Sequence, residues 1–187
     1  MLQGKRIAIL ATDGYEQSEL TEPLKRLREV DADVRIVSLE EGSIRGESNG
    51  QWGDSVSVNE TVDNVSADDF DALVIPGGLY NPDQLRANSE AVGFVRSMFD
   101  AKKPIAAICH GPWLLVEAGI ARGRKLTSYP SIRTDITNAG GLWIDEEVVV
   151  DQGLITSRSP KDLDAFIAKI VEEIREGRHE DRVTRAA

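Results

Sequence analysis

The residue best suited to chemistry in this chain is Cys109, its only cysteine, which one of its two histidines follows directly. The apolar run 104–108 ends at Cys109, and Gly111 and Pro112 precede a second apolar run, 113–116. This pattern predicts a buried strand that turns sharply into a helix, with the cysteine at the turn. Because the free amides at a helix start favour negative charge, we expect a reactive thiol there.

A different interpretation of Cys109 has to be weighed against this one. A lone cysteine in an intracellular protein is more often a small buried hydrophobe, and the adjacent His110 is then incidental. The small residues Ala107 and Gly111 on either side are what a tight nucleophile turn requires. The context therefore favours a nucleophile or a redox-active thiol.

Thiol chemistry on a carbonyl also needs a proton carrier and donors for the developing oxyanion. The His110 amide follows the turn, and Gly77 and Gly78 form a loop whose backbone can approach a ligand, although a tight turn explains two glycines equally well. Glu16 follows the first predicted strand. Its carboxyl either keeps a proton and donates it to the sulfur or simply favours a helix N-terminus.

The two histidines differ in their expected roles. Neighbouring residues at a sharp turn point in different directions, so the ring of His110 need not reach the sulfur of Cys109. His179 follows the last predicted helix in a charged segment, where a histidine is typically solvated and not catalytic. If the site has a base, we expect it to be His110.

Buried strands alternate with helical segments along the chain, which predicts a single α/β domain with a mostly parallel sheet and helices on both faces. The turn after the first strand, the Gly77–Gly78 loop and Cys109 then meet beyond the carboxyl ends of the strands. We expect the domain to span 1–176 and a charged tail to span 177–187. The predicted strands are 5–11, 33–39, 72–75, 104–108, 125–128, 148–150 and 154–156, with a hairpin or edge strands within 40–66; the predicted helices are 16–30, 89–101, 131–139 and a last one capped by Ser159.

Composition bounds the function. The chain has 187 residues, 41% of them hydrophobic, and a net charge of −10. This acidity argues against binding to nucleic acid or to an anionic membrane. One cysteine and two histidines are too few for a Cys/His metal cluster or a disulfide framework. We find no signal peptide and no apolar stretch of spanning length, so we expect a cytoplasmic protein.

Several motifs together resemble the PfpI family of intracellular protease-like proteins, which is related to the parkinsonism-associated stress protein and to class I glutamine amidotransferases. The resemblance covers nearly the whole chain, and the set of motifs at these spacings is highly specific. The motifs are residues 13–20 (DGYEQSEL), 70–78 (FDALVIPGG), 109–112 (CHGP), 127–129 (TSY), 138–140 (NAG), Trp143 and 148–151 (VVVD).

The resemblance implies a flavodoxin-like three-layer sandwich with Cys109 as nucleophile and His110 beside it. It also implies that Glu16 touches the sulfur, that Gly78 and the His110 amide form the oxyanion hole, and that Tyr129 lines the site. In protease-like members a glutamate of an adjoining subunit orients the histidine. The matching residue here is Asp83, one methylene shorter, so that contact is looser or absent.

Three functions compete on these grounds. The favoured one is a deglycase- or glyoxalase-like stress-response enzyme that acts on a small reactive carbonyl or on a modified protein. The second is a peptidase or amidase that uses Cys109, His110 and Asp83 across the interface of a homodimer or higher homo-oligomer. The third is a non-enzymatic redox sensor or chaperone in which Cys109 is oxidised. No cofactor and no metal are implied by any of them. Glutaminase activity and dinucleotide binding fit poorly, since the expected downstream histidine and glycine fingerprint are lacking.

Overall fold

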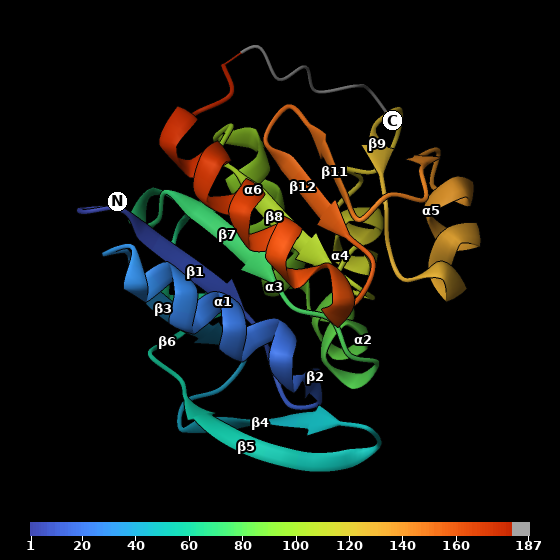
Figure 1. Cartoon of the computed structure of the whole chain (residues 1–187). Coiled ribbons are helices and arrows are strands. Elements are labelled where there is room, and N and C mark those ends of the chain that lie inside the picture. Colours follow the sequence, from blue (N-terminus) through green and yellow to red (C-terminus); the bar gives the residue numbers. More distant parts are fainter. Residues whose placement is uncertain (181–187) are drawn as a thin grey trace.

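A computed structural model describes residues 1–180 as a three-layer α/β sandwich built on a seven-stranded sheet (Figure 1). The strand order is β11-β12-β8-β7-β1-β3-β6, and all neighbours are parallel except β11 and β12. The mostly parallel sheet predicted from the alternating pattern is confirmed. The strands of this sheet are β1 Arg6–Leu10, β3 Asp33–Ser38, β6 Glu60–Thr61, β7 Ala72–Ile75, β8 Ile105–Ile108, β11 Val148–Asp151 and β12 Leu154–Ser157.

Both faces of the central strands are buried, which explains their continuous apolar sequences. In β1, Ala8 and Leu10 pack into one apolar core, whereas Ile7 and Ile9 pack into the other. Each core is closed by helices. The helices α1 Gln17–Glu29 and α6 Leu163–Glu176 cover one face, and α2 Tyr80–Arg86, α3 Ser89–Asp100 and α4 Trp113–Glu117 cover the other.

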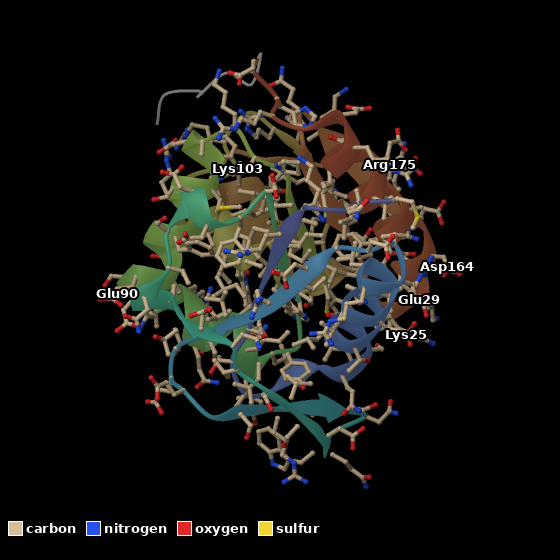
Figure 2. The ribbon with its side chains drawn as sticks, turned by 90° about the vertical axis from the view of Figure 1, so that its left-hand side faces the viewer. Lys25, Glu29, Glu90, Lys103, Asp164 and Arg175 are labelled. Carbon is tan, nitrogen blue, oxygen red and sulfur yellow. The ribbon has the colours of Figure 1, made fainter. Side chains whose placement is uncertain are left out.

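The helices turn charged side chains away from the sheet. Figure 2 shows Lys25 and Glu29 on α1, Asp164 on α6 and Glu90 on α3 projecting outward, and all four residues are exposed. This is the amphipathic pattern of helices that each cover one side of a sheet. Within residues 1–180, no helix combines the length and the apolar character needed to cross a membrane.

A smaller sheet flanks the main one and contributes residues to the candidate site. It contains β2 Tyr15–Glu16, β4 Ser43–Ser48 and β5 Gln51–Ser57, with β4 parallel to β2 and antiparallel to β5. The hairpin predicted within 40–66 is therefore present. The remaining elements are β9 Lys125–Leu126, β10 Leu142–Trp143, α5 Arg133–Asn138 and the 3-10 turns η1 Val62–Asn64, η2 Ala67–Asp69, η3 Pro130–Ile132 and η4 Pro160–Asp162.

Local predictions were wrong at three places. Helix α2 was not predicted, because it contains Pro82 and proline usually breaks a helix. Pro82 lies in the first turn of α2, where proline is tolerated. The predicted strands 148–150 and 154–156 leave a turn of three residues, but Asp151 pairs with Leu154, so the β11–β12 turn has only two, Gln152 and Gly153, both with positive φ. Ser159 makes no side-chain cap, since a 3-10 turn precedes the start of α6 at Leu163.

The order of strands explains where the site lies. The chain passes from β1 to β3 on one side and then crosses to β7 on the other side of β1. Such a reversal of direction opens a crevice beyond the carboxyl ends of the strands. The segments after β1, β7 and β8 all reach this edge, as the sequence predicted.

Candidate functional site

Cys109 stands at the sharp turn that the sequence predicts after β8. Its φ is +62°, a left-handed conformation that costs a residue other than glycine about 1–3 kcal/mol. The turn is held by three backbone bonds: Cys109 N donates to Ser157 O at 3.0 Å, Tyr129 N donates to Cys109 O at 2.8 Å, and Gly111 N donates to Ile108 O at 2.8 Å. The backbone strain therefore persists because the neighbouring strand and loop fix the position.

The glycine loop after β7 lies directly against this turn. A Cβ on Gly77 would come within 2.6 Å of both Cys109 Cβ and Glu19 Oε2. Gly78 has a φ of +83°, and a Cβ there would lie 2.4 Å from Gly14 O. Only glycine fits at both positions, and the fit brings the Gly78 amide into a hydrogen bond with the Cys109 sulfur.

The carboxyl at the sulfur belongs to Glu19 and not to Glu16, so the role predicted for Glu16 is wrong. Glu19 is fully buried, its Oε2 accepts from Gly77 N at 2.8 Å, and its carboxyl is hydrogen-bonded to the Cys109 side chain. Glu16 lines the same pocket, and its carboxylate accepts from Ser18 Oγ at 3.3 Å.

A signal for Glu19 was present in the sequence. Glu19 belongs to the buried stripe of α1 with Leu20, Pro23 and Leu27. An acidic side chain on the apolar face of an amphipathic helix is shielded from water, so it requires a hydrogen-bond partner inside the protein. The sequence reasoning selected the acid closest to the strand and did not consider which helix face it occupies.

Burial raises the pKa of Glu19 to about 8, and the charge of Glu16 acts in the same direction. Burial also raises the pKa of the Cys109 thiol, and the negative charge of Glu19 raises it further. Hydrogen bonds from the amides of Gly78 and His110 lower it. Burial and Glu19 therefore oppose the ionisation of the thiol, while the two amides of the turn favour it. The helix after the turn, Trp113–Glu117, is one turn and a half long and offers little dipole to offset burial.

Glu19 and Cys109 behave as one coupled pair. At neutral pH the carboxyl keeps its proton and can donate it to the sulfur. Loss of a first proton near pH 8 leaves one negative charge to be shared by the carboxyl and the sulfur. A nucleophilic thiolate therefore requires a neighbouring group that accepts the thiol proton.

His110 is placed to be that acceptor, because its ring reaches the sulfur although the two residues are neighbours at a sharp turn. Its Nδ1 lies 3.2 Å from Cys109 Sγ, and its Nε2 lies 3.1 Å from Ser131 Oγ. Its ring is stacked on Tyr129 with centroids 4.9 Å apart and packs in a T-shaped arrangement with Trp113, with centroids 5.1 Å apart. Burial lowers the pKa of His110, so the ring is neutral at pH 7 and can accept a proton.

Asp83 does not contact His110 within one chain. It lies on α2 with its side chain 61% exposed and pairs with Arg86 at 2.7 Å. Arg86 in turn lies over the Trp113 ring, 4.2 Å from its centroid. The second ring nitrogen of His110 faces Ser131 instead, a partner that the sequence reasoning did not identify. A triad with Asp83 of a second copy stays a prediction.

Cys109, His110 and Glu19 open into a pocket of about 280 Å³. Tyr129 and Gly78, both predicted for the site, line it, and Tyr129 is 40% exposed. A volume of this size suits a small molecule or a single side chain and not a folded polypeptide. The other lining residues are Glu16, Glu47, Asn49, Gly50, Leu79 and Pro160.

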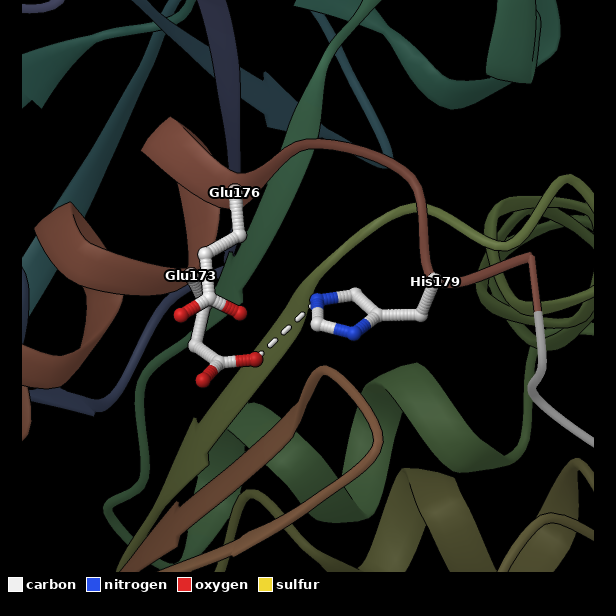
Figure 3. A group of neighbouring side chains, drawn as sticks. All are labelled: Glu173, Glu176 and His179. Atoms are coloured by element: carbon white, nitrogen blue, oxygen red, sulfur yellow. Dashed lines mark ion pairs between the residues drawn. The ribbon is translucent and has the colours of Figure 1, made fainter.

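His179 lies at the opposite end of the sheet, and the prediction that it is solvated is wrong. Its Nε2 pairs with Glu173 Oε2 at 3.0 Å, and its backbone N donates to Lys102 O at 2.9 Å. Figure 3 shows Glu173, Glu176 and His179 facing one another at the end of α6. One ligand atom from each lies within 4.8 Å of the others, a donor set that a divalent cation could use. Of the predicted tail, residues 181–187 lie outside the described part.

A mostly parallel sandwich with a cysteine at a strained turn, a histidine and a buried glutamate defines a class of α/β cysteine proteins. The family model "DJ-1/PfpI family" matches residues 5–173. The chain belongs to the DJ-1/PfpI family.

Named relatives span almost the whole chain. Deglycase PH1704 of Pyrococcus horikoshii is 46% identical over 89% of this chain and 97% of its own. General stress protein 18 of Bacillus subtilis is 46% identical over 87% of this chain and 94% of its own. The crystal structure of Drosophila melanogaster DJ-1beta has a TM-score of 0.82 and 29% identity, covering 92% of this chain and 94% of that one. The expected family and flavodoxin-like sandwich are thus confirmed.

Proposed function

We propose that the protein is a cysteine-dependent enzyme that consumes reactive α-oxoaldehydes or removes their adducts from amines and thiols. One observation carries the proposal: two groups contact the Cys109 side chain. His110 Nδ1 lies 3.2 Å from Cys109 Sγ, and the Glu19 carboxyl is hydrogen-bonded to the same side chain. The pocket of about 280 Å³ fits a substrate of three carbons. The name of its relative Deglycase PH1704 agrees with this activity.

The first step is attack on the aldehyde carbon, here written for methylglyoxal. His110 Nδ1 accepts the thiol proton while the Cys109 sulfur forms a bond to the carbon. The carbonyl electrons move to oxygen, where the amides of Gly78 and His110 stabilise the charge. His110 then returns the proton to this oxygen, which gives a hemithioacetal. For an adduct, the amine or thiol first leaves the carbinol carbon with a proton.

The second step moves a proton from the aldehyde carbon to the neighbouring carbon. Glu19 lies beside the same sulfur, so its carboxylate is placed to take this proton and return it at the ketone carbon. The hydroxyl on the first carbon gives its proton to His110, which passes it to the ketone oxygen, so that the first carbon becomes the thioester carbonyl and the second carries the hydroxyl. The product is a lactoyl thioester of Cys109. Water hydrolyses the thioester, which releases lactate and restores the thiol, so the overall reaction adds one water to methylglyoxal.

The test is to measure lactate released from methylglyoxal by the wild type, Cys109→Ser and Cys109→Ala. We expect many equivalents of lactate per chain from the wild type and a loss of about 10³-fold or more in kcat/KM in both variants. Lactate that never exceeds one equivalent, with methylglyoxal still consumed, would indicate trapping by the thiol. Equal rates in the wild type and Cys109→Ala would refute the proposal.

A second candidate, a peptidase or amidase, rests on the exposure of α2. Asp83 is exposed there, and Leu79 and Tyr80 beside it are 59% and 60% exposed. Such an apolar surface next to an acid suits contact with a second copy of the chain, whose Asp83 would then approach His110. Sedimentation of wild type and Tyr80→Glu tests this: a wild-type monomer would contradict both the oligomer and the intersubunit triad.

A further inference from the structure

Two carboxylates face each other at the mouth of the Cys109 pocket. The parallel pairing of β2 with β4 sets Tyr15 opposite Gly46 and Glu16 opposite Glu47. Both glutamates line the pocket, and both are partly buried. Like charges directly opposite each other on neighbouring strands destabilise a sheet, so this pair carries an electrostatic cost.

The pKa of Glu16 is raised, mainly by burial. Hydrogen bonds from Ser18 act against this rise, and the charge of Glu47 adds a smaller contribution to it. A cationic group between the two carboxylates would relieve this repulsion. Within residues 1–180, no lysine or arginine lines the pocket at that point: Arg45, the basic residue of β4, donates its Nε to Gly53 O at 2.9 Å and does not line the pocket.

The charge of the whole lining points in the same direction. The acids Glu16 and Glu47 line the pocket together with Glu19, which keeps its proton at neutral pH, and within residues 1–180 the lining contains no lysine or arginine. A concave site whose charges share one sign attracts ligands of the opposite sign and repels those of the same sign. The net charge of −10 adds to this field.

We propose that Glu16 and Glu47 make the pocket select substrates that carry a cation near the reactive carbon, such as adducts of amines, over anionic ones. This selectivity rests on the proposed function for its substrate class, while the field at Cys109 does not depend on turnover. Phosphate- and carboxylate-bearing adducts are disfavoured by the same carboxylates. Glu47 acts through charge alone and takes no part in the chemistry.

The field can be measured without any enzyme activity, because Cys109 is the only cysteine. We would compare its rate of reaction with 2-(trimethylammonio)ethyl methanethiosulfonate and with 2-sulfonatoethyl methanethiosulfonate. In each case the thiolate forms a disulfide and methanesulfinate leaves. Rates are normalised to those of 2-mercaptoethanol. We expect the cationic reagent to be favoured by about tenfold, the size of effect expected for charges a few ångström apart at a partly solvated mouth.

Variants test whether the preference for the cationic reagent comes from Glu16 and Glu47. Glu47→Gln should lower the cation preference about threefold, Glu47→Lys should lower it further, and high salt should weaken it in the wild type. The matched control is Glu90→Gln, an exposed acid on α3 that does not line the pocket (Figure 2), which should leave the preference unchanged. No preference in the wild type, or an equal preference in Glu47→Gln, would overturn the inference.

Substrates extend the test to catalysis. Methylglyoxal hemithioacetals of thiocholine, 2-mercaptoethanol and thioglycolate share one reactive carbon and carry a cation, a neutral group or an anion, respectively, close to it. We expect kcat/KM to fall in that order, and we expect the ratio of kcat/KM between the cationic and the anionic substrate to shrink in Glu47→Gln. Turnover of all three at one rate would contradict the selectivity. If none is turned over while the reagents still show the preference, the proposed function fails and the selective pocket stands.

Discussion

The two histidines of the chain lie at opposite ends of the sheet and have different partners. His110 lies at the carboxyl end of the sheet beside a sulfur and near a buried glutamate, whereas His179 lies at the amino end and pairs with Glu173 at 3.0 Å. Both rings are largely buried. The difference is that the partner of His110 is a thiol at 3.2 Å, which has a proton to give, while the partner of His179 is a carboxylate at 3.0 Å. The same residue type is thus placed for proton transfer at one end of the sheet and pairs with α6 at the other.

The largest effect should come from the histidine at the site. His110→Gln removes the acceptor for the thiol proton, so we expect kcat for lactate release to fall by about 10²–10⁴-fold. His179→Gln serves as the matched control and should leave kcat within about twofold. Similar losses in the two variants would erase the distinction between the two ends.

Glu19→Gln should follow, with a loss of about 10²-fold in kcat. The glutamine still accepts from the Gly77 amide, so the backbone of the loop is retained, but it cannot move the carbon proton. Glu16→Gln is the matched control on the same pocket and should lower kcat by less than about threefold. A larger loss in Glu16→Gln than in Glu19→Gln would restore the role first predicted for Glu16.

Ser131→Ala tests the contact at the second ring nitrogen of His110. Loss of the hydroxyl at 3.1 Å frees the ring to rotate, so we expect kcat to fall about threefold to tenfold with KM unchanged. Ser131→Thr keeps the hydroxyl and should restore most of the rate. Asp83→Asn is the competing variant, and a larger loss there would assign the orienting role to Asp83 of a partner subunit.

We expect the smallest effect on activity from a substitution of His179, at the amino end of the sheet. His179→Ala leaves the Glu173 carboxylate, 8% exposed, without its ring partner, so urea unfolding should show a loss of about 1–2 kcal/mol. Cys109 lies far from this pair, so lactate release should stay unchanged. Loss of activity without loss of stability would mean that the end of α6 communicates with the site.

Topology and small residues could be predicted from the sequence, and side-chain direction could not. Cys109, Gly77 and Gly78 were grouped correctly because parallel strands bring their carboxyl ends to one edge and because only glycine allows such close approach. The residues that were missed act through side-chain direction. Glu19 required knowledge of the buried face of α1, and Ser131 lies in a turn that packs against His110 from 21 residues away.

The ionisation of the thiol could not be predicted from the elbow pattern. The sequence shows amides near Cys109, which favour a thiolate, but not the depth of burial or the Glu19 charge, which oppose it. Deciding between these opposing effects requires the three-dimensional surroundings. The same holds for Glu16, which the strand pairing sets against Glu47 and away from the sulfur.

The pH dependence of kcat/KM for lactate release, in the wild type and Glu19→Gln, tests the joint action of Cys109, His110 and Glu19 most directly. Because the pKa of Glu19 is raised to about 8, its carboxylate is scarce below that pH and dominant above it. The rate should therefore rise through pH 8 in the wild type, and this rise should vanish from the residual activity of Glu19→Gln. A rise with the same midpoint in both proteins would contradict the account.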